Sequence, residues 1–168
     1  AGFQDFNQRV RAPRGFYLGN SARDRVWKTK TGKAQFLPPE QPFIPEVLQQ
    51  PDTFRLTTIR AHGQFNTTIY DLDDRYRGVY GERDVLFMHP DQMAAQGWQV
   101  GQRVDVTAIY AHETRTLKHL KLMPFDLPLD CVAAYYPEAN DLIPLSHHVP
   151  RAHTPAYKSI AVRIHACP

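Results

Sequence analysis

Residues 56–68 read LTTIRAHGQFNTT, an apolar and β-branched segment that runs directly into a loop of small and hydrogen-bonding residues. The composition of residues 56–59 is typical of a buried strand, because threonine and isoleucine pack well on a pleated surface. Gly63 allows the backbone to approach another group closely, and Arg60 offers a planar guanidinium fork that suits phosphate. The segment therefore predicts a strand that delivers a binding loop for an anionic ligand.

Further short strands are predicted on both sides of this segment, from alternating apolar residues or from short apolar runs. Residues 89–98 combine a proline near the first turn with helix-forming residues and a glycine stop at Gly97, which predicts one short helix. A set of at least six short strands with little helix favours a closed barrel over a sheet flanked by helices. The predicted strands are residues 53–59, 84–88, 100–110, 115–122, 131–136 and 159–164.

The first third of the chain differs from the rest in its proline content. Prolines break long helices and central strands, and six of the 14 prolines fall here: Pro13, Pro38, Pro39, Pro42, Pro45 and Pro51. We therefore expect residues 1–51 to form an extended arm and residues 52–168 to form one compact domain. A chain of 168 residues with 42% hydrophobic and 22% charged residues is large enough to bury a core.

Four segments, taken in order, resemble motifs of the last domain of molybdopterin-dependent oxidoreductases of the formate dehydrogenase and dimethyl sulfoxide reductase superfamily. The resemblance covers most of the chain and identifies it as similar to the C-terminal domain of a formate-dehydrogenase-like alpha subunit. It implies a mainly β fold, a double-psi β-barrel of six to seven strands with one or a few short helices. The segments are WKTKTGKAQF at 27–36, the loop at 56–68, YYPEANDL at 135–142, and TPAYK at 154–158 with the strand at 160–164.

The same resemblance implies that the chain binds part of a molybdenum bis(molybdopterin guanine dinucleotide) cofactor, shared with upstream domains of a longer oxidoreductase. Two pyrophosphates make this ligand strongly anionic, so basic forks, backbone amides beside glycine and side-chain amides are suitable partners. A histidine often occupies the position of Gln64 in relatives, and this chain departs from the pattern there. The predicted cofactor-binding residues are Arg60, His62, Gly63, Gln64, Asn66, Thr67, Asn140, Tyr157 and Lys158.

Several of these residues also have a purely structural interpretation. Arg60 could form a structural salt bridge, and Lys158 could be a surface charge. Asn66 and Thr67 could cap a turn, and Asn140 could be an ordinary loop residue. Both interpretations stay open at the level of the sequence.

The segment at residues 71–78, DLDDRYRG, places two arginines beside three aspartates. It is not a calcium loop, because Arg75 and Tyr76 occupy positions that require an oxygen ligand and a glycine. We expect Arg75 and Arg77 to belong either to a salt-bridged loop or to the rim of a cofactor site.

No residue spacing in the sequence predicts a catalytic or metal site. Cys131 and Cys167 lack the C-x-x-C spacing of zinc and iron–sulfur sites, and we expect Cys167 to be a simple tail thiol. The eight histidines follow no ligand spacing, and no nucleophile elbow or paired acid is present. We therefore expect the chain to orient a cofactor and to be inactive alone, with any iron–sulfur cluster carried upstream.

The composition also limits the partners. The net charge is only +3, and the basic residues show no interleaving with aromatic residues, which argues against a nucleic-acid module. No apolar run approaches the roughly 20 residues that span a bilayer, and the first residues lack the apolar core of a secretory signal. We expect a cytoplasmic protein whose partners are the remaining domains of the parent oxidoreductase.

Two alternative functions stay open, because double-psi barrels also serve in other roles. One is a stand-alone binding module for a peptide or nucleotide, and the other is a small hydrolase or decarboxylase. An open, one-sided groove would favour the cofactor domain, and a peptide groove would favour the module. Titratable groups that converge in a closed pocket would favour the enzyme.

Overall fold

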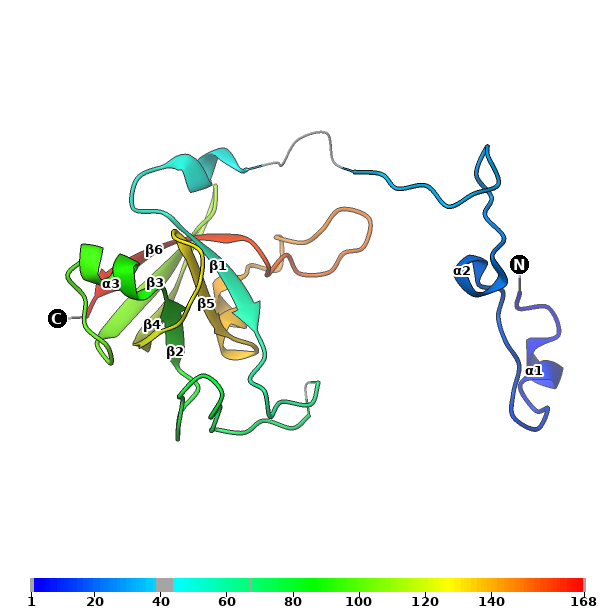
Figure 1. Ribbon diagram of the computed structural model, residues 1–168, viewed down its shortest axis with the longest axis horizontal. Helices are drawn as coiled ribbons and strands as arrows, with labels where there is room; N and C mark the ends of the chain where they lie inside the picture. Colours follow the sequence, from blue (N-terminus) through cyan, green and yellow to red (C-terminus); the bar gives the residue numbers. More distant parts are fainter. Residues whose placement is uncertain (1, 39–43, 67, 168) are drawn as a thin grey trace. The chain divides into compact units, whose positions relative to one another are not determined.

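The computed structural model describes residues 2–38, 44–66 and 68–167 (Figure 1). The chain divides into two units, Ala1–Phe43 and Ile44–Pro168. The first unit contains two single-turn helices, α1 (Phe6–Arg9) and α2 (Ser21–Asp24), and none of its described residues is buried. The second unit begins with the 3₁₀ helix η1 (Glu46–Gln49). No helix in the described part of the chain has the length and apolar character needed to cross a membrane.

Six strands form a closed barrel in the second unit, in the order β1-β5-β2-β4-β3-β6 (Figure 1). All six strands predicted from the sequence are confirmed, and so is the short helix, α3 (Pro90–Ala95). The strands are β1 (Phe54–Ile59), β2 (Val85–Met88), β3 (Arg103–Ile109), β4 (Thr114–Pro124), β5 (Cys131–Tyr135) and β6 (Ile160–Ala166). The fold is therefore mainly β, as predicted.

Strand pairing in the barrel mixes parallel and antiparallel neighbours. The pairs β1–β5 and β2–β4 are parallel and join strands that are distant in sequence, with Ile59 opposite Tyr135 and Val85 opposite Lys121. The other four pairs are antiparallel. Parallel partners need long crossover connections, and the loop after β1 lies between one such pair, β1 and β5. This arrangement is that of the double-psi barrel predicted above.

The barrel interior explains the residue patterns of the strands. β1 and β3 alternate between buried and partly exposed residues, as strands with one core face do. β2 is buried along its whole length, and β5 is buried at every residue after the first. The outer faces of these two strands are covered because Ala61 and Val79 pack against Phe87, Ala133 and Tyr135. The loop between β1 and β2 is therefore anchored to the barrel by apolar contacts.

Three connections meet at one rim of the barrel. The end of β1 lies beside the end of β5, where Ile59 is paired with Tyr135, and beside the start of β6, where Leu56 is paired with Ile160. The backbone N–H of Thr58 donates to the carbonyl of Tyr157 at 3.2 Å. The loop after β1, the 3₁₀ helix η2 (Glu138–Leu142) after β5 and the segment before β6 therefore meet at this rim. Most of the predicted ligand-binding residues lie on these three connections.

Candidate functional site

Three of the predicted site residues line one small cavity at this rim. The cavity has a volume of about 170 Å³, and its walls include Arg60, Tyr157 and Lys158. The ammonium group of Lys158 donates to the backbone carbonyl of Thr58, and the hydroxyl of Thr57 donates to the carbonyl of Lys158 at 2.7 Å. Hydrogen bonds to β1 therefore hold the segment before β6, and with it Lys158, against the end of the strand that carries Arg60.

The two cations of this cavity have no acidic partner in the described part of the chain. Among the described residues, neither Arg60 nor Lys158 forms an ion pair with a carboxylate. Arg60 instead donates from Nη1 to the side-chain oxygen of Asn66 at 3.4 Å. Burial, and then the nearby charge of Arg60, lower the pKa of Lys158. Two cations that repel each other across a small cavity form a site that an anion would stabilise.

A second cavity adjoins the first, since Tyr157 lines both. It has a volume of about 300 Å³ and also contains Asn140 together with mainly apolar residues. The side-chain oxygen of Asn140 is buried and has no hydrogen-bond partner among the described residues. A buried acceptor without a partner costs about 1–3 kcal/mol, so a ligand that donates a hydrogen bond would complement this wall.

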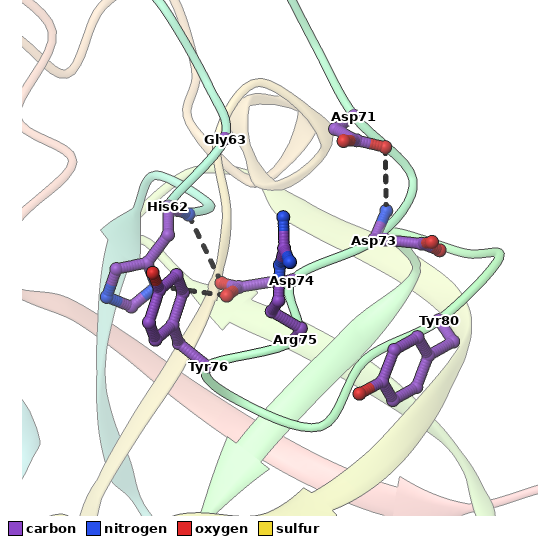
Figure 2. Close-up of a pocket in the computed structure, with 8 residues that line it drawn as sticks. All are labelled: His62, Gly63, Asp71, Asp73, Asp74, Arg75, Tyr76 and Tyr80. Atoms are coloured by element: carbon purple, nitrogen blue, oxygen red, sulfur yellow. Dashed lines mark hydrogen bonds and ion pairs between the residues drawn. The ribbon is translucent and has the colours of Figure 1, made fainter.

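A third cavity, of about 480 Å³, has the opposite chemical character (Figure 2). His62 and Gly63 line it together with two exposed tyrosines, Tyr76 and Tyr80, and the ring centroid of His62 lies 4.7 Å from that of Tyr76. Acidic and aromatic groups therefore dominate this cavity. Its remaining wall residues are Asp71, Asp73, Asp74 and Arg75.

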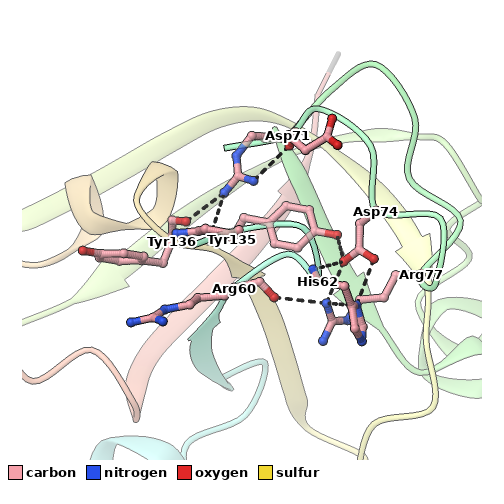
Figure 3. Close-up of polar contacts among 9 residues, drawn as sticks. Arg60, His62, Asp71, Asp74, Arg77, Tyr135 and Tyr136 are labelled. Atoms are coloured by element: carbon pink, nitrogen blue, oxygen red, sulfur yellow. Dashed lines mark hydrogen bonds and ion pairs between the residues drawn. The ribbon is translucent and has the colours of Figure 1, made fainter. Parts of the chain in front are cut away.

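Asp74 is the buried centre of the loop that forms this third cavity (Figure 3). Its carboxylate accepts hydrogen bonds from the Tyr135 hydroxyl at 2.8 Å, from Arg77 Nη1 at 2.7 Å and from His62 Nδ1 at 2.9 Å. Burial alone would raise the pKa of Asp74, but these three hydrogen bonds lower it to about 2. Burial and the bond to Asp74 raise the pKa of Tyr135. Of the two interpretations of the loop, the structure shows the salt bridge between Arg77 and Asp74.

Arg83 is a buried residue near the site that the sequence motifs did not predict. Its guanidinium is buried. On the side of β5 it donates to the carboxylate of Glu138 at 2.6 Å and to the carbonyl of Tyr136 at 2.8 Å. On the side of β1 it donates to the side-chain oxygen of Gln64 at 3.1 Å and to the carbonyl of Asp71 at 3.2 Å. It joins the loop after β1 to the segment after β5. A single arginine between two loops has no spacing signal, because its partners are fixed only by the folded barrel.

The predicted residues in the loop after β1 are not all equivalent. Gln64 is buried, receives a hydrogen bond from Arg83, and donates from its amide to the carbonyl of Asn66 at 2.9 Å. Asn66 is exposed and adopts a left-handed backbone conformation with φ of 50°, as a turn residue does. Thr67 lies outside the described residues. The structure thus brings Arg60, Tyr157 and Lys158 together, places Asn140 next to them, and leaves His62 and Gly63 in a separate cavity.

Comparison with known proteins identifies the family of this barrel. Residues 54–161 match the family described as "Molydopterin dinucleotide binding domain". The match runs from the start of β1 to the second residue of β6, so it covers the first five strands and the rim loops.

Longer bacterial proteins contain a similar chain. Protein YdeP of Escherichia coli strain K12 is 38% identical over 170 residues, which cover 96% of this chain and 22% of that protein. The Mycobacterium tuberculosis protein named "Uncharacterized oxidoreductase Rv2900c" is 40% identical over 169 residues, which cover 97% of this chain and 21% of that protein. The chain thus spans about a fifth of the length of these curated relatives.

One solved structure in the comparison is acetylene hydratase from Pelobacter acetylenicus, with a TM-score of 0.47 and 16% sequence identity. The superposition covers 73% of this chain and 19% of that chain.

Proposed function

This chain belongs to the molybdopterin dinucleotide-binding domain family, and we propose from that premise that it binds part of a molybdenum bis(molybdopterin guanine dinucleotide) cofactor in a longer, formate-dehydrogenase-like oxidoreductase. One observation carries the proposal. Arg60 and Lys158 line the same rim cavity without an acidic partner among the described residues. A pyrophosphate supplies the missing negative charge and accepts charge-assisted hydrogen bonds from both side chains.

The adjoining cavity supports the same ligand. The buried oxygen of Asn140 has no described hydrogen-bond partner, and a pterin carries N–H groups that can donate to it. Tyr157 stands between this oxygen and the two cations, since it lines both cavities. When bound, the cofactor supplies molybdenum redox chemistry, while these residues bind and orient it.

The guanine form of the cofactor is supported by the acidic cavity of Figure 2. The edge of guanine that pairs with cytosine carries N–H donors, and carboxylates accept such hydrogen bonds. Asp71 and Asp73 are exposed in this cavity, so they can accept from the base, while the rings of Tyr76 and Tyr80 offer stacking surfaces. We assign these four residues to guanine recognition.

Catalysis is proposed to belong to the longer protein and not to this chain alone. The relatives are about five times as long as the matched segment, which leaves room for the domains that complete the cofactor site. We propose that these domains are the partners of the barrel, and that an iron–sulfur cluster, where the enzyme uses one, is held by them. This chain alone is expected to show no turnover of formate with an artificial electron acceptor.

The test replaces the two cations in the longer oxidoreductase. An Arg60→Gln, Lys158→Met double variant keeps unbranched side chains but removes both charges and two charge-assisted hydrogen bonds, each worth about 1.5–3 kcal/mol. We expect the purified enzyme to lose most of its molybdenum and its releasable guanine nucleotide, as measured by elemental analysis and chromatography.

The matched control is Arg163→Gln, because Arg163 is an exposed arginine on β6 that lines none of the three cavities. This variant should keep its molybdenum and nucleotide content. Normal cofactor content in the double variant would contradict the proposal.

A further inference from the structure

Three side chains with metal-binding groups meet on the barrel, outside the three cavities described above. They are Asp105 on β3, His119 on β4 and Cys167 just after β6. The sulfur of Cys167 lies 3.2 Å from Oδ1 of Asp105 and 3.5 Å from Nδ1 of His119. The three ligand atoms all lie within 4.8 Å of one another. Cys167 is therefore not the unengaged tail thiol that its sequence position suggested.

The backbone around this cluster departs from regular strand geometry. The pairing of β3 with β4 shifts register between Val104 and Val106, as at a β-bulge. His119, inside β4, has a left-handed φ of 60°, which is uncommon for a residue other than glycine. At this irregular position the imidazole of His119 lies beside Cys167, with Nδ1 3.5 Å from the sulfur.

Hydrogen bonds hold this irregular geometry in place. The backbone N–H of His119 donates to Oδ1 of Asp105 at 2.9 Å, and the guanidinium of Arg103 donates to the carbonyl of His119 at 3.0 Å. The backbone N–H of Cys167 donates to the carbonyl of Arg103 at 3.0 Å. All three ligand-bearing residues are thus fixed by contacts between strands, which is the rigidity that a metal site needs.

We propose that Asp105, His119 and Cys167 form a zinc site with one coordination position open to water. Thiolate, imidazole and carboxylate are the zinc ligands of proteins, and bonds of about 2.0–2.3 Å at tetrahedral angles place ligand atoms roughly 3.3–3.8 Å apart. The two separations from the Cys167 sulfur, 3.2 and 3.5 Å, lie close to this range, and the third pair of ligand atoms lies within 4.8 Å. Zn²⁺ would replace the thiol proton that Cys167 now donates to Asp105, and that proton would pass to solvent.

The nearby charges are compatible with a bound cation. Arg103 and Lys118 are cations near the site, and the charge of Lys118 acts on Asp105. Nη2 of Arg103 pairs with a carboxylate oxygen of Glu82 at 3.0 Å, which offsets the charge of Arg103. The ligands lie 14 and 48 residues apart in the sequence, so only the barrel brings them together. The bound ion would connect the segment after β6 to β3 and β4. This site shares no residue with the cofactor cavities, and its assignment does not depend on the proposed function.

The test titrates Zn²⁺ into the metal-free, reduced 168-residue chain in competition with a chromophoric chelator. We expect one equivalent to bind. Co²⁺ in place of Zn²⁺ should show a thiolate-to-cobalt charge-transfer absorption and the visible bands of a tetrahedral site.

Three single variants remove one ligand each. Cys167→Ser removes the thiolate, while Asp105→Asn keeps an oxygen that can accept from the His119 N–H, and His119→Asn introduces a residue that tolerates the left-handed conformation. Each should weaken Zn²⁺ binding by at least about tenfold, the effect seen even for outer-shell partners. Cys131→Ser is the matched control, since Cys131 is the other cysteine of the chain and should be replaceable without effect.

Circular dichroism without metal identifies the variants that remain folded. Only the metal binding of those folded variants is used to test the site. The proposal is overturned when the unmodified chain binds no Zn²⁺. It is equally overturned when the cobalt–thiolate absorption persists in Cys167→Ser, because the sulfur ligand would then be Cys131.

Discussion

At the scale of single residues, Asp74 shows how this loop-rich protein keeps a buried charge. Its carboxylate receives hydrogen bonds from Tyr135 on β5 and from His62 and Arg77 in the connection between β1 and β2. A buried carboxylate without such donors would take up a proton. The position of the connection between β1 and β2 therefore depends on the carboxylate of Asp74 being ionised, because only the ionised form accepts all three hydrogen bonds.

We predict that Asp74→Asn destabilises the chain in a pH-dependent way. The pKa of Asp74 falls from an ordinary value of 3.8 to about 2 on folding, so its ionisation contributes stability that is fully present above the unfolded pKa. This contribution is lost as the pH falls through about 4 toward the folded pKa of about 2. At pH 7 the shift corresponds to about 2 kcal/mol, and urea unfolding should show the difference between Asp74→Asn and the unmodified chain shrinking below pH 4.

The control for this prediction is Asp126→Asn, because the side chain of Asp126 is fully exposed and its Oδ1 lies 3.8 Å from Nε2 of His89, beyond hydrogen-bonding distance. It should change the free energy of unfolding by no more than about 0.5 kcal/mol at any pH. A difference for Asp74→Asn that stays constant from pH 7 to pH 2 would refute the linkage.

At the scale of elements, the connection between β1 and β2 behaves as part of the barrel wall. Ala61 and Val79 cover the outer face of β2 and β5, and Arg83 fastens the same connection to η2 through Glu138. Long irregular segments are usually mobile when they bury little apolar area. Here the apolar cover and the buried guanidinium give the ligand-binding loop a fixed support.

We predict that Arg83→Lys lowers the free energy of unfolding by about 2–4 kcal/mol, because an ammonium group cannot reproduce a buried fork that serves four acceptors. Chemical denaturation of the 168-residue chain measures the change. Arg115→Lys is the matched control, since Arg115 pairs with Glu113 at a similar 2.7 Å but both side chains are partly exposed. Equal effects of the two substitutions would show that Arg83 does not act as a buried clamp.

The strands were predictable because their signals are local. β1 and β3 carry the alternation of a strand with one buried face, and β2 is a short apolar run ended by a proline-initiated helix. The contacts of Arg83 were not predictable, because Gln64 and Glu138 lie 19 and 55 residues away from it. Such pairs follow from barrel closure, which no periodicity in the sequence describes.

At the scale of the whole molecule, the motifs predicted which segments meet at the barrel rim. They did not predict which cavity each side chain lines. The loop after β1 and the segment before β6 do meet, and Arg60 and Lys158 line one cavity. Yet His62 and Gly63, two and three residues after Arg60, line a different and acidic cavity. Neighbouring residues of a turning loop point in different directions, and a motif does not encode that geometry.

The last prediction concerns the two units of the chain. Every buried residue in the described part lies between Thr53 and Ile164, so deletion of residues 1–43 removes no buried side chain of the described part. Because burial of apolar surface supplies most of the folding free energy, the truncated chain should unfold cooperatively within about 1 kcal/mol of the full chain in a urea titration. A longer deletion of residues 1–56 removes Phe54 and Leu56 from β1 and should abolish the transition. A large loss of stability in the shorter deletion would mean that the first unit contributes to the barrel core.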